Sequence, residues 1–420
     1  MAIDIKLEIE QANAKAVNSV IESDPTWIDI LPASEIIEGM GPRTILHSGP
    51  PIEYKNMVPL HQRGMVSGIL FERWAKNEKE AIEMLGTGEI SIESALDHNT
   101  VGAGTGIITP SIMMMVIKDR TSGKIAATFP AEGAFQGGLC GWGLYSKEIA
   151  ANLEYMRTEL LPPLRKLVHK LGGISIKPIL AEGFQMGDEN HTRQTVADLL
   201  LIKKVLPELI KMDLESNILK NVVNYITETP RFFHCFGQGA SMSAMLAAKH
   251  TEYSTMMVAC GGNGVEYGIK VAGLGDAWFT APAPLMEGRY VSTKYTEADQ
   301  LPWIGDSCIV ECGGMGGMAA AASPIVCNLR GMNLAESIAQ TQEMTTICIA
   351  KNPNFAVPNL DFDFLPIGVD IRKVIKHGIM PIVHGGMFNQ SGGLIGAGSA
   401  RIPLGCFEKA LREFGKSYGK

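Results

Sequence analysis

Apolar runs with β-like spacing lie mainly toward the two ends of this chain, and a long stretch between them has the periodicity of helices. Apolar residues recur close to every 3.6 positions between Val196 and Ile210. Short runs rich in Val, Ile and Met lie instead in the first and last thirds. This arrangement predicts an α+β protein, with mixed α/β domains at both ends and a helix-rich middle or an inserted helical domain.

The length of the chain predicts more than one domain. It has 420 residues, and single hydrophobic cores stop growing well below that size, so we expect two or three domains. We assign an N-terminal α+β domain to residues 1–143, a helix-rich segment to 144–254 and a C-terminal α+β domain to 255–420. A small helical unit at residues 333–377 is the competing place for the helices.

Two local signals are sharp. The β-like runs 112–118 and 124–129 are joined by Arg120-Thr121-Ser122-Gly123, which predicts a β-hairpin. A helical block opens after Asp188, and we expect Pro207 to divide it, because proline cannot donate the helix hydrogen bond.

Composition excludes two classes of partner. The formal net charge is -7, and no Lys/Arg cluster is dense enough to follow a phosphate backbone, which argues against nucleic acid and anionic lipid. The longest uncharged stretch, 312–329, contains four glycines and Pro324, so we interpret it as a buried loop and helix rather than a membrane span. The first residues lack a signal-peptide h-region, and we expect a cytoplasmic location.

The eight cysteines show no CxxC pair and no framework spacing. In a chain of this length, that pattern is typical of reduced thiols in a reducing compartment. Cys308 and Cys312 can share a helix face, but two cysteines without further ligands make a weak zinc site.

The richest polar cluster is Met186 to Arg193, which contains Asp188, Glu189, His191 and Arg193 just before an amphipathic helix. One interpretation is helix capping, by Asp188 or by the threonine at 192. The alternative is acid–base or substrate-orienting work, because helical spacing puts Asp188 and His191, or Glu189 and Arg193, on one face.

Glycine-rich turns form the second signal. Gly237-Gln238-Gly239 and Gly313 to Gly317 are expected to open helices, with a helix at 241–250 and a strand at 307–311 beside them. Glycine lets backbone N–H groups approach an anion, and a helix N-terminus adds positive potential. The Gly313 turn lacks the Lys-Ser/Thr of a P-loop and the spacing of a dinucleotide fingerprint. Tight helix–sheet packing is the alternative explanation for either turn.

Isolated histidines form the third signal. His47, His98 and His384 lie in expected loops after apolar runs. With His191 and the adjacent carboxylates they are a conceivable metal set, but no HxH or HExxH spacing connects any two of them. Buried hydrogen-bonding histidines are the plainer interpretation.

Several short segments stand in a fixed order along nearly the whole chain: RTILHSGPP (43–51), VGAGTGIITPS (101–111), MGDENHTR (186–193), GIKVAGLGDAWFTAP (268–282), GDS (305–307) and ECGGMGG (311–317). By these segments the chain resembles the AllG-type family, long catalogued as a domain of unknown function.

The resemblance implies a subunit of oxamate carbamoyltransferase, which exchanges a carbamoyl group between oxalurate and phosphate in anaerobic allantoin and purine breakdown. It also implies partner subunits, among them an FdrA-like protein. The Ser-Thr-Arg-Thr motif with which ordinary carbamoyltransferases bind carbamoyl phosphate is absent from this sequence. Fold analogy to those enzymes therefore fails, and the chemistry would need another phosphate cradle.

Our leading hypothesis is carbamoyl transfer in a pocket formed where residues 186–193 meet residues 311–317. His191, oriented by Asp188 or Glu189, would move the amide proton. Backbone N–H groups of either glycine turn would stabilise the oxyanion and hold phosphate, and arginine would clamp the oxalurate carboxylate. The residues expected to bind substrate or phosphate are Arg43, His47, His98, Arg193, Gly237, Gln238, Gly239, Glu311, Gly313 and Gly314.

We expect no cofactor. Two alternatives stay open: a metal-dependent amidohydrolase-like enzyme that uses His47, His98, His191 and Glu189, and a non-catalytic subunit that binds a metabolite or completes a partner's site. The small molecules considered are carbamoyl phosphate, oxamate and oxalurate, and the oligomeric state stays open, a homo-oligomer included.

Overall fold

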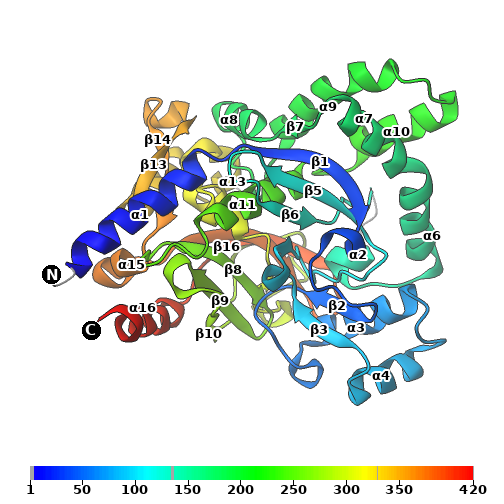
Figure 1. Cartoon of the computed structure of the whole chain (residues 1–420), viewed down its shortest axis with the longest axis horizontal. Coiled ribbons are helices and arrows are strands. Elements are labelled where there is room, and N and C mark those ends of the chain that lie inside the picture. Colours follow the sequence, from blue (N-terminus) through cyan, green and yellow to red (C-terminus); the bar gives the residue numbers. More distant parts are fainter. Residues whose placement is uncertain (1–3, 134–136, 329, 420) are drawn as a thin grey trace.

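The computed structural model describes residues 4–133, 137–328 and 330–419, and it confirms the α+β class (Figure 1). Its helices are α1 (Ile5–Ile21), α2 (Ala33–Ile36), α3 (Pro59–Phe71), α4 (Glu78–Thr87), α5 (Leu139–Trp142), α6 (Lys147–Tyr155), α7 (Leu161–Lys170), α8 (Lys177–Gln185), α9 (Thr195–Ile210), α10 (Ser216–Glu228), α11 (His234–Ala248), α12 (Ile309–Cys312), α13 (Pro324–Asn328), α14 (Leu334–Ile347), α15 (Ile371–His377) and α16 (Leu404–Tyr418). Its strands are β1 (Pro25–Pro32), β2 (Thr44–His47), β3 (Ser91–Ser94), β4 (Thr100–Val101), β5 (Met113–Asp119), β6 (Ile125–Thr128), β7 (Ile174–Ser175), β8 (Met257–Asn263), β9 (Glu266–Val271), β10 (Phe279–Pro282), β11 (Glu287–Tyr290), β12 (Ile304–Gly305), β13 (Cys348–Ala356), β14 (Phe364–Val369), β15 (Ile382–Phe388) and β16 (Leu394–Arg401).

The largest sheet has five strands in the order β4-β6-β5-β1-β7. β5 and β6 form the predicted hairpin, and β1 pairs antiparallel with β5 on its other side. The Asp119 carboxylate holds the hairpin turn by accepting a 3.1 Å hydrogen bond from the Ser122 backbone N–H, as turn-forming aspartates do.

Helix α11 packs on this sheet and is buried along nearly its whole length. It begins at His234, so the prediction that Gly237-Gln238-Gly239 is a turn opening a helix at residue 241 is wrong. These glycines lie inside the helix, and a Cβ at Gly239 would come within 2.6 Å of Ile117 Cγ1 on β5. Glycine at position 239 therefore lets the helix approach the sheet closely.

The remaining strands form four smaller sheets. β10-β9-β8-β12 form a four-stranded sheet, and β11-β16-β15 form a three-stranded one. β13 pairs with β14, and the parallel pair β2–β3 stands apart near α3 and α4 (Figure 1). The strand expected at residues 307–311 is instead the short helix α12, so the glycine turn after it follows a helix.

Helices α6, α7, α9 and α10 of the middle segment lie along one edge of the molecule (Figure 1), whereas α11 of the same segment is buried. The prediction that Pro207 divides its helix is wrong, because α9 runs through it. Pro207 and Lys203, whose carbonyl loses its helix partner, are both exposed, so water can replace the missing bond.

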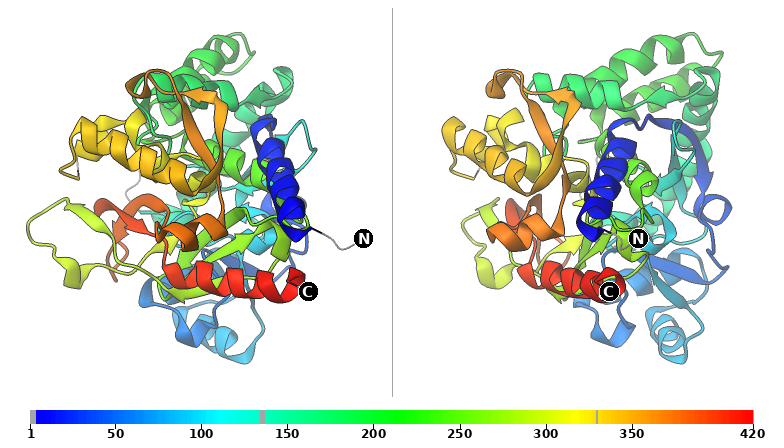
Figure 2. Two further views of the ribbon diagram at one scale, coloured as in Figure 1. Left: turned by 90° about the vertical axis from the view of Figure 1, so that its left-hand side faces the viewer. Right: turned by 60° about the vertical axis from the view of Figure 1, so that its left-hand side comes forward.

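One cluster of buried apolar side chains draws on all three segments to which we assigned domains, including Trp27, Phe236 and Phe407. The first helix, α1, and the last helix, α16, lie on the same side of the molecule (Figure 2). In the part of the chain that the structure describes, every helix is too short or too polar to cross a bilayer.

Candidate functional site

A cavity of about 170 Å³ opens where the five-stranded sheet, α11 and β15–β16 come together. Its walls combine aromatic and glycine residues with a small set of polar side chains. Such a mixture is typical of small-molecule sites. The polar residues used below are Thr192, His191, Arg231, His234 and Gln238.

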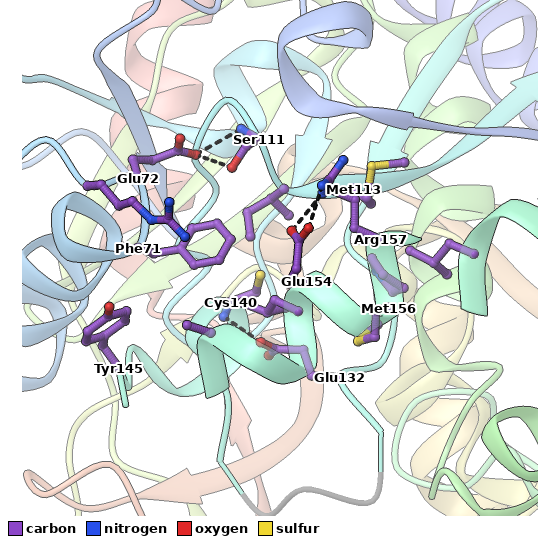
Figure 3. A pocket seen from close by; sticks show the side chains of 16 residues that line it. Phe71, Glu72, Ser111, Met113, Glu132, Cys140, Tyr145, Glu154, Met156 and Arg157 are labelled. Atoms are coloured by element: carbon purple, nitrogen blue, oxygen red, sulfur yellow. Dashed lines mark hydrogen bonds and ion pairs between the residues drawn. The ribbon is translucent and has the colours of Figure 1, made fainter. Parts of the chain in front are cut away.

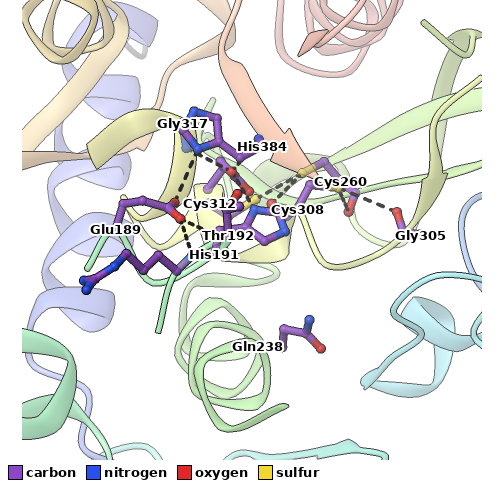
Figure 4. A network of polar contacts seen from close by, with 12 residues as sticks. Glu189, His191, Thr192, Gln238, Cys260, Gly305, Cys308, Cys312, Gly317 and His384 are labelled. Carbon is purple, nitrogen blue, oxygen red and sulfur yellow. Dashed lines mark hydrogen bonds and ion pairs between the residues drawn. The ribbon is translucent and has the colours of Figure 1, made fainter. Parts of the chain in front are cut away.

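The two turns singled out in the sequence contact each other beside this cavity (Figure 4). The Gly316 backbone N–H donates a 2.7 Å hydrogen bond to the Glu189 carbonyl. His191 Nδ1 lies 2.8 Å from Glu311 Oε1, with both side chains buried. A pair 120 residues apart in sequence is thus brought together at the wall of the cavity.

The Glu311 carboxylate is held in place by backbone donors. Besides His191, its Oε1 accepts hydrogen bonds from His384 N (2.9 Å) and Gly317 N (3.0 Å). Gly316 has φ +57°, and a Cβ there would come within 2.8 Å of Glu311 Cδ and 2.9 Å of His191 Cβ. The turn therefore needs glycine at this position both for its conformation and for space.

Burial and charge act in opposite directions on His191. Burial lowers the pKa of the imidazole, but the charge of Glu311 and the hydrogen bond to it outweigh burial, so the pKa of His191 is raised above its ordinary value. Burial raises the pKa of the Glu311 carboxyl, and His191 opposes that shift. Nε2 has no hydrogen-bond partner among the described residues, which leaves it free to exchange a proton with a ligand.

A second imidazole stacks on the first. The ring of His234 lies 5.9 Å from that of His191, with an interplanar angle of 21°. Its Nδ1 contacts the Gln194 amide at 3.0 Å, and its Nε2 contacts the Gln238 amide at 2.5 Å. Burial and the nearby Arg231 charge lower the pKa of His234 well below its usual value, so this ring is neutral.

Arg231 is the cation at this cavity, and the sequence analysis did not single it out. It lines the cavity with φ +55°, and it forms no ion pair with any side chain in the described part of the chain. Strained backbone of this kind recurs at ligand-binding positions. The only sequence signal is its place in Pro230-Arg231-Phe232-Phe233-His234, directly before the buried helix α11.

The residues Asp188 and Arg193 serve the start of α9 rather than the cavity. Asp188 Oδ2 accepts hydrogen bonds from Val196 N (2.7 Å) and Ala197 N (2.9 Å). These bonds are the kind that the capping interpretation of Asp188 predicts. Asp188 Oδ1 pairs with Arg193 Nη1 at 2.7 Å, and the same nitrogen donates to the Gly187 carbonyl. Arg193 is therefore already occupied, and it is outside the cavity lining.

The glycine turns do not offer free N–H groups in the way we expected. The N–H groups of Gly237 and Gly239 belong to the hydrogen-bonding pattern of α11, and only the side chain of Gln238 reaches the cavity. Gly313 packs on Ser241, where a Cβ would lie 2.9 Å from Oγ. Gly314 packs on the Pro366 carbonyl, at 2.5 Å from such a Cβ.

Three further predicted residues lie elsewhere. Arg43 pairs with Glu89 at the surface (2.9 Å). His47 is buried, donates from Nδ1 to the Ser48 carbonyl (2.8 Å) and lies outside the cavity lining. His98 pairs with Glu93 at 2.5 Å.

The metal set of the alternative hypothesis is not assembled. His47 and His98 have the local partners given above, and neither joins His191 in the lining of the cavity. Within residues 4–133, 137–328 and 330–419, no group of three or more His, Cys, Asp or Glu side chains has an arrangement suited to a metal ion.

A larger cavity of about 480 Å³ shares the Glu132 wall with the first (Figure 3). Glu132 is buried, and its carboxylate accepts hydrogen bonds from Leu139 N (2.8 Å) and Cys140 N (3.2 Å) at the start of α5. Most of the other lining side chains are apolar. Burial raises the pKa of Glu132, and those N–H donors oppose the shift.

Comparisons with known proteins find similarity along nearly the whole chain. Residues 90–307 match the model of the family described as oxamate carbamoyltransferase subunit AllG. The chain is 32% identical over 416 residues to the protein named oxamate carbamoyltransferase subunit AllG from Escherichia coli (strain K12), covering 98% of this chain and 99% of that protein. It is 33% identical over 414 residues to the uncharacterized protein YahG of the same organism, covering 98% of this chain and 87% of YahG.

A solved structure has the same fold. The crystal structure of a conserved protein of unknown function from Enterococcus faecalis V583 superposes with a TM-score of 0.95 at 32% identity, covering 99% of this chain and 100% of that one. The similarity thus extends over the first and last segments as well as the middle.

Proposed function

The chain belongs to the AllG family of oxamate carbamoyltransferase subunits, and from that premise we propose that it contributes the proton-transfer and carboxylate-binding residues of the carbamoyl-transfer site. The proposed reaction is attack of phosphate on the carbamoyl carbon of oxalurate. The C–N bond to the oxamate nitrogen breaks, carbamoyl phosphate forms, and the departing nitrogen takes up a proton.

The observation that carries this proposal is the buried His191–Glu311 pair at the wall of a cavity of about 170 Å³. An amide nitrogen leaves poorly unless a proton reaches it in the transition state, so the site needs a positioned general acid. The raised pKa of His191, caused by the Glu311 charge against the effect of burial, favours the imidazolium that such an acid requires. In the reverse direction the neutral ring would accept the proton from oxamate.

Arg231 is proposed to bind the substrate carboxylate. Among the described residues no carboxylate forms an ion pair with this guanidinium, and a guanidinium in the lining of a small cavity matches a carboxylate bidentately. The Thr192 hydroxyl and the Gln238 amide are the neutral groups proposed to orient the carbamoyl oxygen. This assignment replaces Arg193, which is paired with Asp188.

We propose that turnover requires a partner, an FdrA-like subunit, in the cytoplasm. The Escherichia coli relative is named as a subunit, which supports the need for a partner. The acidic composition of this chain argues against nucleic acid as that partner. Neither a membrane nor a nucleic acid enters the proposed activity.

The test is phosphate-dependent formation of carbamoyl phosphate from oxalurate by the chain co-expressed and purified with its FdrA-like partner. His191→Gln is expected to lower kcat by about 10²- to 10⁴-fold. Arg231→Gln is expected to raise KM for oxalurate by about tenfold or more, because a charged hydrogen bond is lost.

Arg193→Gln is the matched arginine control, since its partner is Asp188 outside the cavity lining. It should change KM for oxalurate less than Arg231→Gln does. Wild-type turnover in a folded His191→Gln complex would exclude the proposed role. A complex with no activity on oxalurate would favour a non-catalytic, metabolite-binding subunit.

A further inference from the structure

On the side of His191 away from the cavity lies a buried polar group that the proposed mechanism does not use (Figure 4). Glu189 and His384 have fully buried side chains, and Glu189 Oε2 lies 3.4 Å from His384 Nδ1. Arg330 Nη2 lies 3.2 Å from the same nitrogen. The His384 backbone N–H donates to Glu311 Oε1 at 2.9 Å, which connects this group to the His191–Glu311 pair.

His384 Nδ1 faces one group that only donates and one that only accepts. A guanidinium has no acceptor, so the contact with Arg330 requires a lone pair on Nδ1. The contact with the Glu189 carboxylate requires a proton there. A doubly protonated ring would lose the Arg330 hydrogen bond and set two cations side by side, so Arg330 opposes protonation of His384.

Several polar atoms of this group lack a hydrogen-bond partner within the described residues. They are Glu189 Oε2, Glu311 Oε2, His384 Nε2 and Arg330 Nη1, and all four are buried. Burying a charge without an opposite charge beside it is costly. The charges on these four side chains and on His191 must therefore offset one another. The two carboxylates are matched in charge by Arg330 and by one proton on His191.

We propose that Arg330 and Glu189 are positioning residues: Arg330 holds His384 neutral, and the two carboxylates make His191 the imidazole of this network that binds and releases a proton. The pKa of His384 is lowered to about 4 by burial and by the Arg330 charge. Burial opposes but does not overcome the raising effect of Glu311 and Glu189 on His191.

Two groups on the cavity side also surround His191. Arg231 disfavours the His191 proton from the cavity side, and the neutral ring of His234 stacks on it. A substrate carboxylate that neutralises Arg231 would therefore strengthen the hold of His191 on its proton. The use of that proton rests on the proposed function, whereas the charge arrangement itself does not.

The test is an NMR titration of the imidazole rings in the full chain without substrate or partner, with resonances assigned from His191→Gln and His384→Gln. In the wild type, His191 should titrate above its ordinary value and His384 should stay neutral through the neutral range. Arg330→Gln should bring the titration of His384 toward the ordinary histidine value, and Arg330→Lys should keep the wild-type pattern. Glu189→Gln should lower the midpoint of His191 by about one pH unit.

Arg401→Gln is the matched control, because it removes a guanidinium from a surface pair with Glu343 and should leave both rings unchanged. A folded Arg330→Gln chain in which His384 still fails to titrate would overturn the proposal, as would a folded Glu189→Gln chain with an unchanged His191 midpoint. If Arg330→Gln does not fold, the proposal is tested by the titration of His384 in Arg330→Lys and of His191 in Glu189→Gln. Absence of oxalurate turnover would count against the proposed function and leave this titration untouched.

Discussion

The ring of His191 is held between groups that favour opposite charge states. The Glu311 carboxylate at 2.8 Å favours the imidazolium, whereas burial and the Arg231 charge favour the neutral ring. Because removing either member of a buried charged pair leaves the other uncompensated, both residues are expected to be sensitive to substitution. The balance between these groups should be visible as a pH dependence.

The first prediction concerns the rate of oxalurate phosphorolysis by the complex as pH rises. The pKa of His191 is raised, so the general acid is fully protonated below that value and is lost as pH rises through it. Activity should therefore fall on the alkaline side. In Glu311→Gln the pKa of His191 drops, and the falling limb should move to lower pH; a limb that stays in place would show that another group is the acid.

A second residue-scale prediction concerns Gly316. Gly316→Ala should lower the free energy of unfolding by about 3 kcal/mol, since the new Cβ meets Glu311 and His191 in a left-handed conformation. Gly378→Ala is the control, with φ +64° and open space around the Cβ, and should cost about 1 kcal/mol. Equal losses in urea unfolding would show that the Gly316 contacts do not matter.

At the scale of elements, α11 connects the fold to the site. The helix lies on the five-stranded sheet, and its first turns carry His234 and Gln238 to the cavity. The two glycines inside it have different surroundings. Gly239 faces Ile117 on β5, whereas the nearest atom to a Cβ at Gly237 lies at 3.8 Å.

This difference gives a third prediction within one helix. Gly239→Ala should destabilise the protein by about 1–3 kcal/mol, because the added methyl group forces the helix away from β5. Gly237→Ala should stabilise it by about 0.5–1 kcal/mol, because alanine loses less entropy in a helix and the new methyl group makes only ordinary van der Waals contacts, the nearest at 3.8 Å. Chemical unfolding of both variants checks the signs, and a destabilised Gly237→Ala chain would contradict this account of α11.

Elements with local signals could be predicted from the sequence, and those decided by long-range packing could not. The β5–β6 hairpin was predicted because its turn and both strands are contiguous. The start of α11 was placed too late, because Gly237 and Gly239 resemble helix breakers when the strand they pack on is unknown. The small helical unit considered at residues 333–377 contains the paired strands β13 and β14 between its helices, and this pairing depends on a partner beyond an intervening turn.

The same division applies to the site. The segments 186–193 and 311–317 were singled out from their composition, and the structure brings them into contact. Which side chains pair across that contact depends on tertiary structure, so Asp188 or Glu189 was expected beside His191, where Glu311 lies. Arg231 carries no local signal of its own, because a lone arginine among aromatic residues is common.

At the scale of the whole molecule, one apolar core connects all three segments. The eight cysteines are buried free thiols, and seven of them, all but Cys327, belong to this core. The fourth prediction is that a thiol reagent such as DTNB reacts slowly with the native chain and with all eight cysteines after unfolding. Several fast-reacting thiols in the native protein would contradict the burial of these side chains.

The most direct test of the central claim is a crystal structure of the chain, alone or with its partner, containing oxamate and phosphate. We expect the oxamate carboxylate on Arg231 and its amide nitrogen within hydrogen-bond reach of His191 Nε2. Oxamate bound elsewhere, with His191 and Arg231 left free, would contradict the account.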